Sequence, residues 1–394
     1  MIIKRKLSSV LKELTRQFPV TLLTGSRQSG KSTLFQGLFP KYEYLTLDDL
    51  RTRDLALNDP ELFLSYHKTP LIIDEIQNAP DLLSYIKLKI DKTRSKGSYL
   101  LTGSQQFSLM SNVHESLAGR LGIASLCPFS IEEFYIDRNK NIPLWSEIAL
   151  KGLYPQPNVE KNIKITNWFS SYIDSLLNKD IKNNLKKDHL MAYDHFIKLI
   201  ATRSSLELNF LNLSKELGVS SLTVQSWTQL LEKSQLIYLV PPYYKNLGKR
   251  IVKANKLFFL DPGLVSYLTG HRSTIQIQDG PLTGQLFETL VVSEIIKYFY
   301  NRGEKPPIFY FRDNLGLEVD LLIEFQNKVL LIEIKSTSSP SRSHIEPMKK
   351  VKKLIPNSKA ILLCNRQEDY PLDKEIKSIH WSNISAFLKT FFKT

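Results

Sequence analysis

The chain has 394 residues, a formal net charge of +14 and a pI of about 9.4. Hydrophobic residues make up 42% of it and charged residues 23%, which is typical of a globular protein, and this length predicts two or three domains. No apolar stretch approaches the ~20 residues of a membrane-spanning helix, and the N-terminus lacks the pattern of a secretion signal. Cys127 and Cys364 lack metal-ligand spacing, and two reduced thiols indicate a cytoplasmic protein.

The first motif is a glycine-rich loop, preceded by a short apolar run and followed by apolar residues at helical spacing. A loop of this kind between a strand and a helix is typical of a phosphate-binding site. Lys31 is expected to contact the β- and γ-phosphates of ATP, and the Ser32 hydroxyl to bind Mg²⁺. All residues of the loop are predicted to hold the nucleotide: Gly25, Ser26, Arg27, Gln28, Ser29, Gly30, Lys31, Ser32 and Thr33.

The apolar run before Asp74 and Glu75 predicts a buried strand that ends in two acids. Ligands bind at the carboxyl ends of such strands, so we expect Asp74 to hold Mg²⁺ and Glu75 to orient or deprotonate the attacking water. A third strand is expected between the other two, with Ser104 as a sensor of the γ-phosphate. Arg120, at a helix end, is either an arginine finger for a neighbouring chain's nucleotide or a charge that offsets the helix dipole.

The middle of the chain is basic, since residues 161–260 hold 15 Lys and Arg against 7 Asp and Glu. This excess favours a polyanionic partner such as DNA, with solubility alone as the alternative. Two short helices around Gly218, followed by two strands, predict a helix-turn-helix with a wing. The second helix offers no arginine to the bases, so phosphate contacts are expected from the wing. Its basic residues are Lys245, Lys249, Arg250, Lys253 and Lys256. The alternative is a spacer that packs the flanking domains together.

The last third carries Glu288 on a predicted helix, Asp320 on one apolar strand, and Glu333 and Lys335 on the next. Glu333 and Lys335 are two residues apart and therefore point to one face of their strand. Burying an unpaired carboxylate is costly, and a divalent cation between Asp320 and Glu333 would offset that cost. Carboxylates suit Mg²⁺ or Mn²⁺, Lys335 would stabilise developing charge, and Glu288 would be a further ligand or support one. This is the PD-(D/E)XK arrangement of metal-dependent nucleases. A solvated edge strand with a Glu333–Lys335 pair is the alternative.

The chain resembles a large bacterial and archaeal family in these motifs: Gly25–Thr33, Asp74–Gln77, Thr102–Ser104, and Gly119–Arg120 followed by Pro128–Phe134. Members of that family join an AAA-type ATPase domain to a C-terminal PD-(D/E)XK nuclease-like domain. The resemblance implies an α/β protein of three domains. They are a P-loop parallel sheet sandwiched by helices (1–155), a helical and winged-helix module (156–265), and a restriction-endonuclease-like α/β core (266–394).

The predicted function is ATP hydrolysis coupled to nucleic-acid processing, with ATP and Mg²⁺ at the N-terminal site and Mg²⁺ or Mn²⁺ at the C-terminal one. One alternative is a nucleotide-dependent switch whose C-terminal domain binds a protein or DNA without cleaving it. Another is a ring-forming motor, because an arginine finger that acts in a neighbouring chain requires a homo-oligomer.

Overall fold

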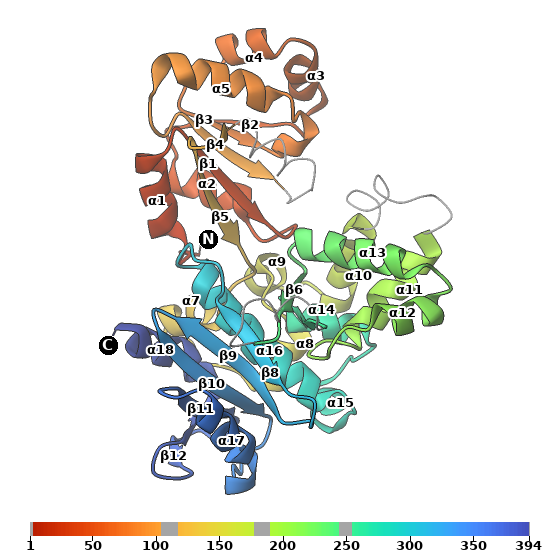
Figure 1. Ribbon diagram of the computed structural model, residues 1–394. Coiled ribbons are helices and arrows are strands. Elements are labelled where there is room, and N and C mark those ends of the chain that lie inside the picture. Colours follow the sequence, from red (N-terminus) through yellow and green to blue (C-terminus); the bar gives the residue numbers. More distant parts are fainter. Residues whose placement is uncertain (1–2, 104–116, 177–189, 244–253, 394) are drawn as a thin grey trace.

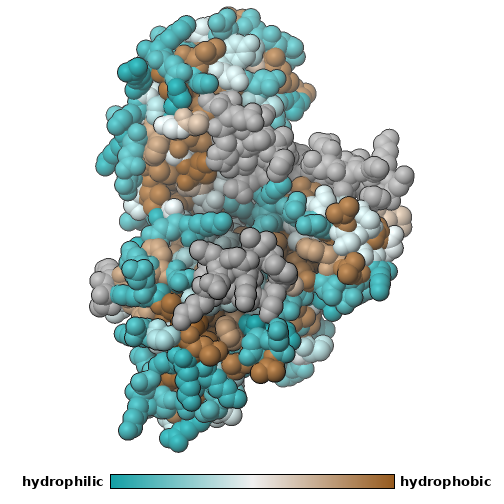
Figure 2. Space-filling model, viewed as in Figure 1, coloured by the Kyte–Doolittle hydropathy of each residue, from teal (hydrophilic) through white to brown (hydrophobic). Residues whose placement is uncertain are grey.

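The computed structural model describes residues 3–103, 117–176, 190–243 and 254–393. Figure 1 shows an N-terminal α/β lobe, a C-terminal α/β lobe, and helices between and beside them. On the face shown in Figure 2, hydrophilic residues predominate and hydrophobic ones lie in separate patches. Within the described ranges, no helix combines the length and apolar character needed to cross a membrane. Five predicted site residues lie outside these ranges and stay predictions: Ser104, Lys245, Lys249, Arg250 and Lys253.

The N-terminal lobe contains five strands: β1 (Val20–Gly25), β2 (Glu43–Thr46), β3 (Leu71–Asp74), β4 (Tyr99–Gly103) and β5 (Leu121–Leu126). They form one sheet in the order β2-β3-β4-β1-β5, and every neighbouring pair is parallel. This order confirms the prediction that the third strand, β4, lies between the phosphate-loop strand β1 and the acid-tipped strand β3.

Among the described residues of this lobe, five helices accompany the sheet: α1 (Ser8–Gln17), α2 (Lys31–Leu38), α3 (Leu50–Asn58), α4 (Pro60–Tyr66) and α5 (Leu82–Thr93). Successive strand residues enter two different cores, because side chains alternate between the faces of a strand. Leu22 and Ile73 pack in the core that includes α5, whereas Leu23 and Ile72 pack in the core that includes α1 and α2. Helices therefore cover both faces, which explains why the strands are apolar throughout and confirms the predicted sandwich.

After β5 the chain runs through a set of helices: α7 (Ile131–Phe134), α8 (Trp145–Lys151), α9 (Pro155–Val159), α10 (Ile165–Ser175), α11 (Leu190–Ala201), α14 (Pro262–Leu268) and α15 (Thr274–Asp279). Residues 127–154 share a third core with later parts of the chain. The ring of Trp145 meets that of Phe287 edge-on at 5.2 Å, and the Ser266 hydroxyl donates to the Ala149 carbonyl oxygen at 2.7 Å. The predicted domain boundary at residue 155 thus falls inside a shared core. The sequence could not show this, because an amphipathic pattern reveals the apolar face of a helix but not the element that packs against it.

Two helices and two strands follow within this region: α12 (Phe210–Leu217), α13 (Ser221–Lys233), β6 (Ile237–Val240) and β7 (Lys256–Phe259). Gly218 ends α12 in the left-handed conformation, with φ +66°. The Ser220 hydroxyl begins α13 by accepting a hydrogen bond from the Thr223 N–H at 3.0 Å. β6 and β7 pair antiparallel. The elements therefore occur in the order and positions that the sequence pattern predicts.

The C-terminal lobe contains six strands: β8 (Ile308–Arg312), β9 (Glu318–Phe325), β10 (Lys328–Lys335), β11 (Lys359–Cys364), β12 (Tyr370–Pro371) and β13 (Lys377–His380). Their order is β12-β13-β11-β10-β9-β8. The strands β8, β9 and β10 are antiparallel neighbours, whereas β11 pairs parallel with β10. Its helices are α16 (Thr283–Tyr300), α17 (Glu346–Leu354) and α18 (Ile384–Lys393). The helix and two strands predicted around the acidic residues are present, and both cysteines are buried and free.

Candidate functional site

The loop between β1 and α2 lines a cavity of about 540 Å³. Gly25 turns the chain so tightly that a Cβ on it would lie 2.4 Å from the Leu126 carbonyl oxygen, so this position requires glycine. Gly30 has φ +94°, a conformation that L residues rarely adopt. The loop then enters α2, whose first-turn N–H groups are a favourable environment for phosphate.

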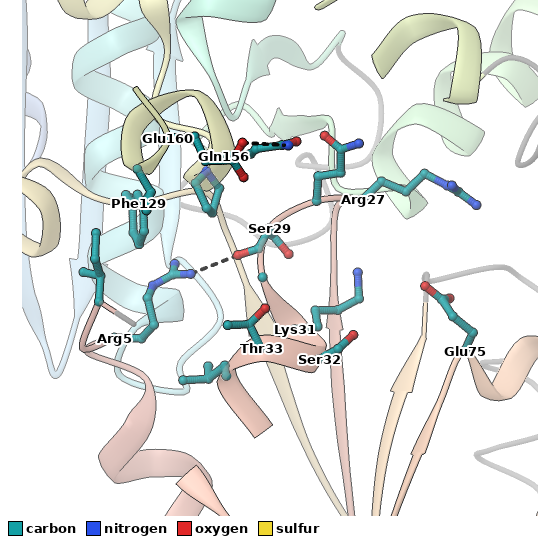
Figure 3. Close-up of a pocket in the computed structure, with 16 residues that line it drawn as sticks. Arg5, Arg27, Ser29, Lys31, Ser32, Thr33, Glu75, Phe129, Gln156 and Glu160 are labelled. Carbon is teal, nitrogen blue, oxygen red and sulfur yellow. Dashed lines mark hydrogen bonds between the residues drawn. The ribbon is translucent and has the colours of Figure 1, made fainter. Parts of the chain in front are cut away.

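Lys31 is buried at the centre of this loop. Its ammonium donates to the carbonyl oxygens of Gly25 at 3.1 Å and Ser26 at 3.0 Å. The same ammonium lies beside the cavity together with Ser32 and Glu75 (Figure 3). A phosphate group that enters here can replace the two carbonyl oxygens as its partner.

Asp74, at the tip of β3, accepts hydrogen bonds from three hydroxyl groups. The Ser32 Oγ donates to Asp74 Oδ1 at 2.8 Å, and the Thr102 hydroxyl donates to the same oxygen. The Tyr44 hydroxyl donates to Asp74 Oδ2 at 2.8 Å. Burial and the neighbouring Asp74 raise the pKa of Tyr44 to about 12, so this phenol stays protonated. A carboxylate and a hydroxyl this close suit the coordination shell of Mg²⁺ beside nucleotide phosphates.

Glu75 follows Asp74 in the left-handed conformation, with φ +58°. Its N–H donates to Thr102 Oγ1 at 3.3 Å, and the side-chain amide of Gln77 donates to its carboxylate. This conformation costs a non-glycine residue roughly 1–2 kcal/mol. The contacts from β4 and Gln77 stabilise it, and they hold the carboxylate at the end of the cavity where Lys31 and Ser32 lie (Figure 3).

The other end of the cavity is built by residues that the sequence analysis missed. Arg5 lies 4.8 Å from the Phe129 ring centroid. Its guanidinium pairs with Glu133 at 3.0 Å and donates to the carbonyl oxygens of Ser29 at 3.0 Å and Cys127 at 2.7 Å. Figure 3 shows Arg5 and Phe129 on the opposite side of the loop from Glu75. The remaining lining residues outside the loop are Ile3, Leu34, Pro155, Gln156, Val159 and Glu160. Apart from Leu34, which follows the loop on α2, no local pattern marks them, because they come from segments before and after the sheet.

Arg120 does not line this cavity. Its carbonyl oxygen accepts a hydrogen bond from Val20 at the start of β1, whereas the phosphate-binding loop follows the end of that strand. Its guanidinium pairs with Asp91 at 2.6 Å and donates to the Ala118 carbonyl oxygen at 3.1 Å. Arg120 is therefore not part of the nucleotide site of its own chain. A contact with a neighbouring chain's nucleotide stays a prediction.

The predicted C-terminal residues Asp320, Glu333 and Lys335 lie together. The Lys335 ammonium is 2.7 Å from Glu333 Oε1 and 3.3 Å from Asp320 Oδ2. Burial and the nearby Asp320 raise the pKa of Glu333 to about 7, and the same two causes raise the pKa of Glu288, on α16, to about 8. The structure thus brings all four predicted residues into one electrostatic cluster.

A second lysine, Lys256 at the start of β7, enters the same cluster. Its ammonium contacts Glu318 Oε1, lies 3.7 Å from Glu288 Oε1, and lies 5.3 Å from the Tyr310 ring centroid. Burial alone would lower the pKa of Lys256, but the acidic residues Glu288, Asp320 and Glu318 raise it. The prediction that Lys256 contacts nucleic acid from an exposed wing is wrong, because its side chain is 5% exposed and turned toward the C-terminal acids. The carboxylate cluster, as we call it, consists of Glu288, Glu318, Asp320, Glu333, Lys256 and Lys335.

Two carboxylate oxygens of this cluster, Glu288 Oε1 and Glu333 Oε2, are buried and have no hydrogen-bond partner. Mg²⁺ is commonly held by one or two carboxylates and several waters, so Asp320 and Glu333 suit it. In the described ranges, no three acidic, histidine or cysteine side chains are grouped closely enough to hold a metal ion on their own. The Lys335 ammonium lies between the two acids and would have to move for a cation to bind both.

The parallel sheet, the glycine-rich loop and the Ser32–Asp74 pair define an AAA-type P-loop ATPase domain. Residues 17–135 match the family described as "AAA domain". Residues 142–274 and 283–384 match two families described as domains of unknown function, DUF8612 and DUF4143.

Relatives extend along most of the chain. The uncharacterized proteins Rv2008c of Mycobacterium tuberculosis and Mb2031c of Mycobacterium bovis are each 26% identical over 344 residues, which cover 87% of this chain and 76% of theirs. The uncharacterized protein MJ1637 of Methanocaldococcus jannaschii is 22% identical over 401 aligned positions, covering 89% and 82%.

Two solved structures are also similar to this chain. The Walker-type ATPase PABY2304 of Pyrococcus abyssi has a TM-score of 0.44 and 15% identity, covering 68% of this chain and 96% of that one. A STAND protein with a tetratricopeptide repeat sensor, PH0952 of Pyrococcus horikoshii, has a TM-score of 0.22 and 12% identity, covering 76% and 47%. At these TM-scores neither likeness supports a statement about this chain.

Proposed function

We propose that this ATPase couples ATP hydrolysis to metal-dependent phosphodiester chemistry on nucleic acid in its C-terminal lobe. The charge of the carboxylate cluster carries the proposal. When all groups are ionised, four carboxylates against two ammonium groups leave two negative charges, 4 − 2 = 2, in a largely buried place. One divalent cation between Asp320 and Glu333 would neutralise that excess and supply a partner for Glu333 Oε2, which has no hydrogen-bond partner.

At the N-terminal site, Ser32 and Asp74 would hold Mg²⁺, which neutralises charge between the β- and γ-phosphates. Lys31 exchanges its two carbonyl partners for phosphate oxygens. Glu75 accepts a proton from the attacking water, a role that typically contributes about 10²–10⁴-fold to a rate.

At the C-terminal site, Asp320 and Glu333 would hold Mg²⁺ or Mn²⁺, which lowers the pKa of a bound water and neutralises phosphate charge. The Lys335 side chain is 38% exposed and is therefore free to leave the two acids. Its ammonium then contacts a phosphate oxygen of the substrate and stabilises the negative charge that develops there.

Nucleic acid would be bound through phosphate contacts. The order α12, α13, β6, β7 supports the prediction of a winged helix. Leu222, Gln225 and Gln229 are exposed on α13 and carry no charge, which argues against arginine readout of guanine. The four wing cations Lys245, Lys249, Arg250 and Lys253 would contact the phosphates, and the net charge of +14 favours such a partner.

Cleavage assays on double- and single-stranded DNA and on RNA, with Mg²⁺ or Mn²⁺ and with or without ATP, test this proposal. The wild type is expected to cut one of these substrates. Asp320→Asn is expected to lose cutting and keep ATPase activity, whereas Lys31→Ala is expected to lose nucleotide binding. Asp194→Asn, at an exposed residue of α11, is the matched control. The nuclease half is wrong if the wild type cuts none of the substrates.

The ammonium of Lys335 between Asp320 and Glu333 favours a second candidate. In it, the chain is a nucleotide-dependent switch, and the C-terminal lobe binds a protein or DNA without cleaving it. Gel-shift and cleavage assays on the same samples separate the two candidates. A shift that depends on ATP, without any product, identifies the switch.

A further inference from the structure

We propose that the buried ammonium of Lys256 takes the place of a second metal ion in the carboxylate cluster, so that the C-terminal site accepts a single divalent cation. This inference rests on the proposed metal-dependent function and specifies how that site works. Phosphodiester chemistry at carboxylate sites uses either one metal ion or two, about 4 Å apart. The number of ions therefore distinguishes two mechanisms.

The cluster divides into two groups, each with one lysine between two acids. Lys335 lies between Asp320, on β9, and Glu333, on the neighbouring strand β10. Lys256 lies between Glu288 of α16 and Glu318 of β9. In each group an ammonium holds the position that a cation shared by two carboxylates would take.

The two lysines differ in whether they can leave. The Lys335 side chain is 38% exposed and that of Lys256 is 5% exposed. Moving Lys256 away would place an ammonium without its acidic partners in a buried environment, which is costly. A divalent cation therefore displaces Lys335 and leaves Lys256 in place.

The backbone around Lys256 is fixed to the C-terminal lobe. The Tyr310 hydroxyl lies 2.7 Å from the Ala254 carbonyl oxygen and 3.0 Å from Glu207 Oε1, and it donates its single proton to one of these two acceptors. Glu207 in turn forms a β-bridge with Lys256. The Tyr243 N–H, just after β6, donates to the Tyr310 carbonyl oxygen at 2.7 Å. These contacts hold β7 against β8, so Lys256 has little freedom to move away from Glu288 and Glu318.

Charge gives the same number of ions. With Lys256 present and every group ionised, the excess of two negative charges matches one divalent cation. Without it, four carboxylates against one ammonium leave three negative charges, 4 − 1 = 3, and Glu288 and Glu318 lose the cation between them. Arg312 and Glu207 at the edge of the cluster contribute one charge of each sign and do not change this balance.

The test is the number of Mn²⁺ ions bound by the full chain without nucleotide, counted by electron paramagnetic resonance of free Mn²⁺. The wild type is expected to bind one ion that Asp320→Asn abolishes. Lys256→Ala is expected to bind a second, and the double variant Lys256→Ala/Glu288→Gln to bind one again. Lys256→Arg, which keeps the charge, is expected to stay at one ion, as is Lys198→Ala at an exposed lysine.

Each outcome decides the proposal. A wild type that binds two ions dependent on Asp320 or Glu288 overturns it, and so does a folded Lys256→Ala variant that still binds one. If Lys256→Ala does not fold, the wild-type count and Lys256→Arg decide, since a second ion in either contradicts the inference. A wild type that binds no ion overturns the proposed metal-dependent function itself, and with it the role of Lys256.

Discussion

The side-chain amide of Gln235 donates a hydrogen bond to Ser125 Oγ at 2.9 Å, and Ser125 Oγ lies 3.0 Å from the Thr24 hydroxyl. Gln235 is 5% exposed and comes from the turn between α13 and β6. Thr24 directly precedes Gly25, where the phosphate-binding loop begins. A chain of polar groups, buried at Gln235 and Thr24, therefore joins the middle of the molecule to the nucleotide site.

Replacing Gln235 by Ala is expected to weaken this connection. Loss of the buried hydrogen bond should lower the free energy of unfolding by about 1–2 kcal/mol. The extra stability that a non-hydrolysable ATP analogue confers should also decrease. In the variant, the phosphate-binding loop that the analogue orders is no longer hydrogen-bonded through Ser125 to the segment between α13 and β6. Urea unfolding with and without the analogue measures both quantities. Gln229→Ala, at an exposed position of α13, is the control, and equal behaviour of the two variants contradicts the prediction.

Glu75→Gln is expected to slow ATP hydrolysis by about 100-fold or more, because the amide cannot accept the proton of the attacking water. Nucleotide affinity should stay within a few-fold of wild type, since Glu75 does not belong to the phosphate-binding loop. Phosphate release measures the first effect and a fluorescent ATP analogue the second. Glu61→Gln, at an exposed residue of α4, controls for the loss of one negative charge. A Glu75→Gln variant with near-normal turnover assigns the base elsewhere.

Features encoded in adjacent residues were predictable from the sequence. Three features are of this kind: the phosphate-binding loop, the acids at the end of β3, and the acid-bearing strands β9 and β10. Each is a short pattern of residues next to an element that the sequence also predicts. The place of β4 between β1 and β3 was also predicted, from the strand order common to P-loop ATPases. Strand periodicity predicted that Glu333 and Lys335 share one face of β10, whereas the approach of Asp320 was expected only from the nuclease-like arrangement.

Contacts between distant segments were not predictable. Lys256 belongs to a run of basic residues, which indicated a wing, whereas its side chain in the structure reaches Glu288 of α16 and Glu318 of β9. Arg5 precedes the first strand without any motif, yet it contacts the loop and the segment after β5. Composition cannot distinguish a buried basic residue from an exposed one. Both carry the same charge, and they differ only in which parts of the folded chain pack against the side chain.

Arg5→Lys is expected to destabilise the protein by about 1–3 kcal/mol, because buried hydrogen-bond acceptors lose their donor. One ammonium cannot reach Glu133 and the carbonyl oxygens of Ser29 and Cys127 together. ATP affinity should fall as well, because Ser29 lies in the phosphate-binding loop. Urea unfolding and binding of a fluorescent ATP analogue measure the two effects. Arg16→Lys, at an exposed position of α1, should behave as wild type. An Arg5→Lys variant with the stability and ATP affinity of Arg16→Lys contradicts the prediction.

The stability of the metal-free protein is expected to fall as pH rises from about 5 to 8. Burial and the nearby Asp320 raise the pKa of Glu288 to about 8 and of Glu333 to about 7, so the folded state holds these protons more tightly than the unfolded state. Their contribution is complete below the ordinary pKa of a glutamate and is lost as pH passes through 7 and 8. The expected loss is on the order of a few kcal/mol.

Urea unfolding at pH 5, 6.5 and 8 with a chelator measures this loss, and Glu288→Gln isolates the larger contribution. An amide carries no charge at any of these pH values, so the variant should lose less stability than wild type between pH 5 and 8. Mn²⁺ should stabilise the wild type more at pH 8 than at pH 6.5, because protons compete with the cation for the carboxylates. A wild type whose stability rises over this interval, or a Glu288→Gln variant with the wild-type slope, shows that these two acids are ionised without cost in the folded chain.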